Sequence, residues 1–69
     1  MENVVGSYVV SNNTSVNIYG VLHGVEDKVV FSWNSGRKCS AKIRYDSNGE
    51  PYFMTRNMKI YFNEVQRIL

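Results

Sequence analysis

The stretch that decides the fold is KVVFSWNSGRKCSAKIRY, residues 28–45. Apolar and polar residues alternate in both of its halves, which is the pattern of β-strands with one buried face. Between the halves lies Asn34-Ser35-Gly36, where Gly36 is expected to supply the positive φ of a tight turn. The segment therefore predicts a β-hairpin at the centre of the core, with an inward face made of Val29, Phe31, Trp33, Cys39, Ala41 and Ile43.

The other face of the predicted hairpin is basic. Residues 37–44 hold four positive charges and no acid, on Arg37, Lys38, Lys42 and Arg44. If residues 39–45 form one regular strand, the last three of these charges point the same way. One interpretation is a strip that contacts phosphates, with nearby aromatic rings stacking on bases. The other is a solvated strand face whose lysines discourage edge-to-edge aggregation.

The remaining segments also read as short strands separated by turns. Strands are predicted at residues 4–10, 15–23, 52–55 and 58–62, with turns at 11–14, 46–50 and Arg56-Asn57. Gly20, inside the second of these strands, suggests a bend or a bulge. The pattern predicts one all-β domain over residues 1–69, a small barrel of five to six antiparallel strands.

The tail, residues 63–69, changes character. Asn63 is a good N-cap, and Gln66 three residues later fits a variant of the capping box. One helical turn is expected there, with Val65 and then Ile68 or Leu69 folding back onto the sheet. A turn this short needs tertiary packing to be stable.

Residues 20–36, GVLHGVEDKVVFSWNSG, resemble the core of SH3-like barrels of the Tudor, chromo and KOW type. In those families a strand containing glycine precedes an acidic turn and then a strand of the form V-x-V/F-x-W that ends near a glycine. The segment from Asn63 to Ile68 is similar to the short helical turn that closes many such barrels. The resemblance implies an SH3-like fold. It does not carry over the Tudor aromatic cage for methylated lysine, because no spacing requires the candidate rings, Trp33, Tyr45 and Tyr52, to converge.

Composition narrows the classes of function. A chain of 69 residues has room for one small domain. The single Cys39 forms no internal disulfide, and with His23 alone it falls short of the ligands of a structural zinc site. His23 has no nucleophile or acid at a recognisable catalytic spacing, and the glycines form no phosphate-binding loop. No enzyme activity and no cofactor are predicted.

Two tyrosines are the other candidate site residues. Tyr19 and Tyr61, with Val21, fall on predicted outer faces, where they form a patch for a protein partner or pack beneath loops and the C-terminal tail. Cys39 lies between lysines, which favours a reactive thiolate. Its alternation places it on the inward face, however, so burial as a small apolar residue is the prediction.

These observations lead to a hypothesis about function. The net charge of +2 permits contact with nucleic acid without demanding it. The N-terminus has no basic, apolar leader and no run reaches the roughly 18 apolar residues of a membrane span, so a cytoplasmic protein without membrane contact is expected. Its size resembles that of accessory proteins of phages and other mobile elements.

The chain is therefore predicted to be a non-enzymatic binding protein that engages a protein partner through exposed tyrosines and a sheet edge or outer face. The first alternative is a nucleic-acid-binding module that uses Lys38, Lys42 and Arg44. The second is a subunit of a homo-oligomer that buries its own edge strands.

Overall fold

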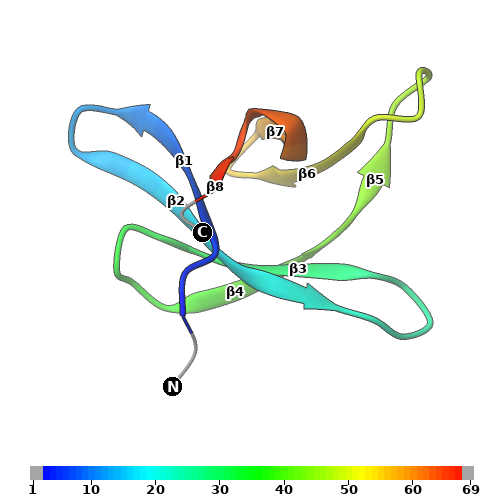
Figure 1. Cartoon of the computed structure of the whole chain (residues 1–69), viewed down its shortest axis with the longest axis horizontal. Helices are drawn as coiled ribbons and strands as arrows, with labels where there is room; N and C mark the ends of the chain where they lie inside the picture. Colours follow the sequence, from blue (N-terminus) through cyan, green and yellow to red (C-terminus); the bar gives the residue numbers. More distant parts are fainter. Residues whose placement is uncertain (1–2, 68–69) are drawn as a thin grey trace.

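The fold is a pair of antiparallel sheets, seen in a computed structural model that describes residues 3–67 (Figure 1). Within those residues the elements follow in the order β1 (Gly6–Ser11), β2 (Thr14–Leu22), β3 (Lys28–Trp33), β4 (Lys38–Lys42), β5 (Arg44–Tyr45), β6 (Pro51–Thr55), β7 (Met58–Tyr61), the 3-10 turn η1 (Phe62–Glu64) and β8 (Gln66–Arg67). One sheet has the order β4-β3-β2-β1-β8, and the other has the order β5-β6-β7.

The all-β prediction is confirmed, but two of its details are wrong. The described part of the chain holds eight strands instead of five to six, and its two sheets do not close into a barrel. The predicted strand after the central turn is interrupted at Ile43, so that β4 pairs with β3 while β5 pairs with β6. The tail adds a further short strand, β8, which pairs with β1.

The predicted hairpin is present as β3 and β4. Phe31 lies opposite Cys39 and Val29 opposite Ala41, so these four residues share one face, as predicted. The turn differs from the prediction, because Asn34 with φ 55° takes the left-handed conformation in place of Gly36. The backbone N–H of Asn34 donates to the carbonyl of Ser15 at 2.7 Å, and its side-chain oxygen accepts from the N–H of Ser15 at 2.9 Å.

Gly20 is a β-bulge, as the sequence suggested. The register of β2 on β3 shifts between Ile18 and Gly20, where φ is 153°. Beyond the bulge the two faces of β2 exchange, so Val21 lies opposite the inward Val29. The expectation that Val21 faces outward is therefore wrong.

The core fills the space between the two sheets. Its buried members come from β2, β3, β6 and β7: Val16, Ile18, Val29, Phe31, Phe53 and Ile60. Phe53 joins the layers, since its ring centroid lies 5.1 Å from that of Phe31 and 5.5 Å from that of Phe62 in η1. Trp33, Ala41 and Ile43 are half-buried against this cluster.

The second sheet is held by a tight turn and a carboxylate. Arg56 and Asn57 both have positive φ, which is the geometry of a two-residue hairpin turn and confirms the predicted turn. Asp46 accepts hydrogen bonds at one carboxylate oxygen from the N–H groups of Asn48 and Glu50, and at the other from the hydroxyl of Tyr61. These bonds fix the turn after β5 to β7.

The C-terminal helical turn begins earlier than predicted. It is a 3-10 turn that starts at Phe62, and no side-chain hydrogen bond caps it. Asn63 lies inside the turn and Gln66 lies in β8, so the predicted capping box is wrong. Pairing of β8 with β1 supplies the tertiary support that so short a turn requires. Ile68 and Leu69, expected to fold back onto the sheet, lie outside the described residues.

Candidate functional site: the outer edge of β4

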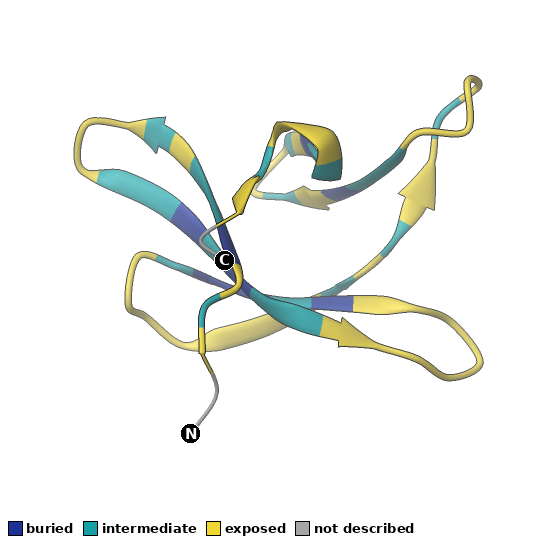
Figure 2. Cartoon of the chain, viewed as in Figure 1, coloured by how far each residue is buried: buried dark blue, intermediate teal, exposed yellow. Residues whose placement is uncertain are grey.

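Strand β4 forms one edge of the larger sheet. Within residues 3–67 it pairs with β3 alone, and four of its five residues are exposed (Figure 2). Alternation in an antiparallel ladder determines which of its backbone groups lie along the open side. The N–H of Ile43 donates to the carbonyl of Asp27 at 3.0 Å, which marks Ile43 as a position whose backbone faces the β3 side.

That bond sets the direction of the backbone groups along β4. Since hydrogen-bonded pairs recur at every second residue, Cys39 and Ala41 direct their N–H and C=O groups toward β3. The bond from Asn34 to Ser15 agrees, because it places the backbone groups of the even-numbered residues of β3 toward β2. The N–H and C=O groups of Lys38, Ser40 and Lys42 therefore face the open side.

The same three residues carry their side chains on the outer face of the sheet. Lys38 lies opposite Ser32, Ser40 opposite Val30 and Lys42 opposite Lys28, all on the side away from the core. Lys38 and Lys42 thus share a face as predicted, and Arg37 lies at the end of the turn before them. Arg44 belongs to the other sheet, so the predicted single strand with three aligned charges is wrong.

Glu26, in the loop before β3, also lies at this surface, which the sequence analysis did not predict. Its carboxylate lies 2.9 Å from the Lys42 ammonium. The hydrogen bond and the charge of Lys42 lower the pKa of Glu26 below its ordinary value, with smaller contributions from the charges of Lys28 and Arg44. The charges of Lys42, Lys28 and Arg44 therefore act on the Glu26 carboxylate, which partly neutralises them.

Tyr19 and Tyr61 do not share a contact surface. Tyr19 is half-buried on the outer face of β2, where its hydroxyl lies 2.9 Å from that of Ser32 and the Lys38 ammonium sits 4.6 Å from its ring centroid. Tyr61 is in the other sheet, packed on Tyr52 and bonded to Asp46, which raises the pKa of Tyr61. Each ring thus has its own structural partners.

The three candidate rings of an aromatic cage also have separate surroundings. Trp33 donates to the Thr55 hydroxyl at 2.9 Å, and its ring centroid lies 4.2 Å from the Arg56 guanidinium. Tyr52 packs on Tyr61 beneath the Lys59 ammonium, and Tyr45 is exposed. None of these contacts joins the three rings.

Cys39 and His23 are the remaining side chains considered for a reactive or metal-binding role. Cys39 faces the same side as Phe31 but is exposed, so its predicted burial is wrong. Among residues 3–67 no strand lies beyond β4 to cover Cys39. His23 lies 3.2 Å from the Asp27 carboxylate at the surface. Among the described residues no group of three or more His, Cys, Asp or Glu side chains is placed to hold a metal ion.

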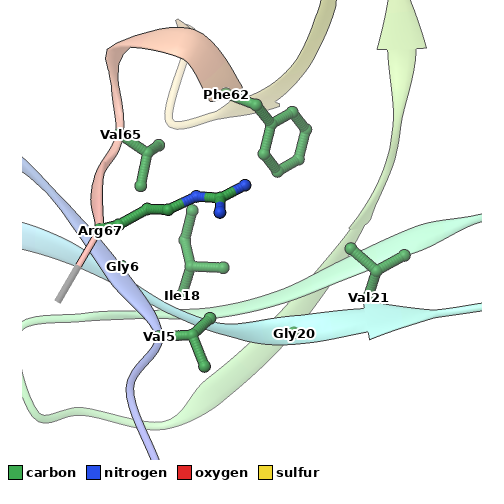
Figure 3. Close-up of a pocket in the computed structure, with 8 residues that line it drawn as sticks. All are labelled: Val5, Gly6, Ile18, Gly20, Val21, Phe62, Val65 and Arg67. Atoms are coloured by element: carbon green, nitrogen blue, oxygen red, sulfur yellow. The ribbon is translucent and has the colours of Figure 1, made fainter. Parts of the chain in front are cut away.

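A cavity of about 430 Å³ lies on the inner side of the larger sheet, between β1, β2 and the segment from η1 to β8 (Figure 3). Its wall is mostly apolar, from residues such as Ile18, Val21 and Phe62, and the Arg67 side chain extends along it. Val21 reaches this wall because of the bulge at Gly20.

Comparisons with known proteins leave the site to be interpreted from its own geometry. No family model matches the chain, and no curated protein or solved structure shows significant similarity to it. In residues 3–67 no helix is long and apolar enough to cross a membrane.

Proposed function

We propose that this chain is a non-enzymatic binding module that engages a protein partner by accepting a strand at the outer edge of β4. The observation that carries the proposal is the direction of the backbone groups of Lys38, Ser40 and Lys42. Backbone groups that face the open side of an exposed strand are a template for β-augmentation, in which main-chain hydrogen bonds supply affinity and side chains supply specificity.

The predicted SH3-like identity remains part of this proposal. It is supported by the short 3-10 turn that precedes the last described strand, where the resemblance placed a helical turn. Cytoplasmic location and similarity to the accessory proteins of mobile elements also remain predictions. They rest on composition and size.

The alternative proposal is a nucleic-acid-binding module that uses Lys38, Lys42 and Arg44. Two observations favour the protein partner over it. Arg44 lies in the other sheet, and the Tyr19 ring is packed beneath Lys38. A phosphate-binding strip with open stacking rings requires the opposite arrangement.

A homo-oligomer through this edge is disfavoured by charge. Two copies of β4 paired antiparallel about Ser40 place Lys38 of each copy directly opposite Lys42 of the other. Like charges directly opposite each other across a ladder are destabilising. Sedimentation at high micromolar concentration tests this point, and a dimer that Lys42→Glu does not strengthen contradicts it.

The test of the proposal compares two changes at one position. Ser40→Pro removes an N–H that faces the open side, and proline is tolerated there because no ladder bond is lost. Ser40→Ala is the matched control, since it keeps the N–H. We expect a protein from the native host to be captured by the wild-type chain and by Ser40→Ala and lost with Ser40→Pro, and its binding to slow amide hydrogen exchange at Ser40 and Lys42.

Three results overturn the proposal. The first is a partner that Ser40→Pro retains equally well, and the second is the capture of no protein at all. The third is binding of nucleic acid that falls steeply with added salt and weakens on changing Lys42 and Arg44 to Ala, which supports the alternative.

A further inference from the structure

We infer that the strand accepted by β4 is an acidic peptide with carboxylates at alternate positions. This inference rests on the proposed function and adds the chemistry of the partner to it. The inference starts from three residues of β4. Lys38, Ser40 and Lys42 direct their backbone groups to the open side and carry their side chains on the outer face.

An antiparallel strand added at this edge must match the alternation of the β4 backbone groups. It forms hydrogen-bonded pairs with Lys38, Ser40 and Lys42, and residues directly opposite each other in such pairs share a face. Every second residue of the partner therefore lies beside the two lysines. The residues between them lie on the inner side, opposite Cys39 and Ala41, whose small side chains leave room for valine or threonine.

The charges around this edge select carboxylates for the alternate positions. Lys38 and Lys42 lie on the outer face together with Lys28, and Arg37 precedes β4. Opposite charges across a strand pair are stabilising, and an attractive field also speeds the encounter. A basic or neutral strand gains the same main-chain bonds without these contributions.

Glu26 already shows that the surface holds a carboxylate. Its oxygen lies 2.9 Å from the Lys42 ammonium, and both side chains are about half exposed, at 46% and 56%. A partner carboxylate beside Lys42 therefore competes with Glu26 for that ammonium. Removal of the Glu26 charge should then tighten binding of an acidic strand.

The experiment titrates the full chain with three seven-residue peptides, followed by the amide chemical shifts of β4. The first, Thr-Glu-Val-Glu-Val-Glu-Thr, has alternating acids. The second, Thr-Val-Glu-Glu-Glu-Val-Thr, has the same composition, but at most two of its acids share a face. The third replaces each Glu of the first with Lys. We expect the alternating acidic peptide to bind about threefold or more tightly than the second and to outcompete the third by a wider margin.

Variants of the chain sharpen the result. Glu26→Gln should tighten the alternating acidic peptide. Lys38→Glu combined with Lys42→Glu should reverse the order of the acidic and basic peptides, with circular dichroism checking that the sheet is retained.

Different outcomes contradict the acidic-peptide inference and the proposed function on which it rests. Peptides that shift the β4 amides equally, whatever their charge pattern, overturn the inference and leave strand addition standing. Absence of binding by the alternating acidic peptide, or an unchanged order after the charge reversal, also overturns the inference. Loss of the captured host protein with Ser40→Pro is a separate readout, and its failure overturns the proposed function itself.

Discussion

Strands β3 and β4 are neighbours with the same alternation, yet one is buried and the other exposed (Figure 2). In β3, Val29, Phe31 and Ser32 are all buried, the last one on the outer face. In β4 only Ala41 is even half-buried. The difference lies in their neighbours: in the described part of the chain β3 has a strand on each side, whereas β4 pairs with β3 alone. Alternation determines which way a side chain points, and the surroundings determine how deeply it is buried.

Phe31 and Cys39 give the comparison its most severe test, because they lie directly opposite each other on the same face. Phe31→Ala should lower the free energy of unfolding by about 3–5 kcal/mol, since Phe31 is 4% exposed and packs on Phe53. Cys39→Ala should change it by less than about 0.5 kcal/mol, because Cys39 is exposed. Urea unfolding measures both, and similar losses for the two variants would refute the contrast.

The second prediction sets adjacent residues of β4 against each other. Ala41→Pro removes an N–H that bonds to β3, which should leave a carbonyl of β3 unpaired and cost about 1–3 kcal/mol more than Ser40→Pro. Ser40→Pro should remain folded at room temperature. Thermal unfolding followed by circular dichroism compares them, and a larger loss for Ser40→Pro would reverse the assigned direction of the backbone groups.

The turn after β5 differs from the β4 edge in its charge: it is held by the Asp46 carboxylate, whereas the β4 edge carries lysines. The N–H of Glu50, together with the Tyr61 hydroxyl and the N–H of Asn48, lowers the pKa of Asp46 below its ordinary 3.8. The stability that Asp46 contributes is therefore complete above pH 3.8 and is lost as the pH falls through its lower folded pKa.

Asp46→Asn should destabilise the chain at neutral pH and remove part of the fall in stability on acidification. Tyr61→Phe is the matched control: it deletes one of the bonds to Asp46, so its acid limb should change less than that of Asp46→Asn. Urea unfolding at several pH values from 2 to 7 measures this, and an acid limb that is the same in wild type and Asp46→Asn would exclude the role of Asp46.

The smallest effect on stability is expected at Glu26. Its ion pair with Lys42 is half exposed, and such pairs contribute little to folding because solvent screens them. Glu26→Gln should leave the Tm close to that of the wild-type chain. A clear loss of stability would mean that Glu26 holds the edge in place structurally, in contrast to the role assigned to it as a competitor for Lys42.

Local patterns predicted the fold where backbone chemistry determines it. Alternation identified β3 and the inward face of β4, Gly20 marked the bulge, and Arg56-Asn57 marked the hairpin turn. These features depend on residues close together in the sequence. The break at Ile43, by contrast, arises because the chain leaves one sheet for the other, and nothing in the local alternation signals that change.

The candidate site was predicted only in part for the same reason. Its lysines were identified from their alternation. Three other features depend on which elements meet in space: Cys39 is exposed, Arg44 pairs in the other sheet, and Glu26 contacts Lys42. A sequence shows that a strand has a basic face, but only the sheet order shows that this strand is an edge.

Amide hydrogen exchange of the unbound chain, measured residue by residue along β4, tests the central claim most directly. If Lys38, Ser40 and Lys42 turn their backbone groups to the open side, the amides of Ser40 and Lys42 should exchange fast, and those of Cys39, Ala41 and Ile43 should exchange slowly. Protection at Ser40 and Lys42 with fast exchange at Ala41 would contradict the claim, because the backbone groups that are proposed to receive a partner strand would then already be bonded within the sheet.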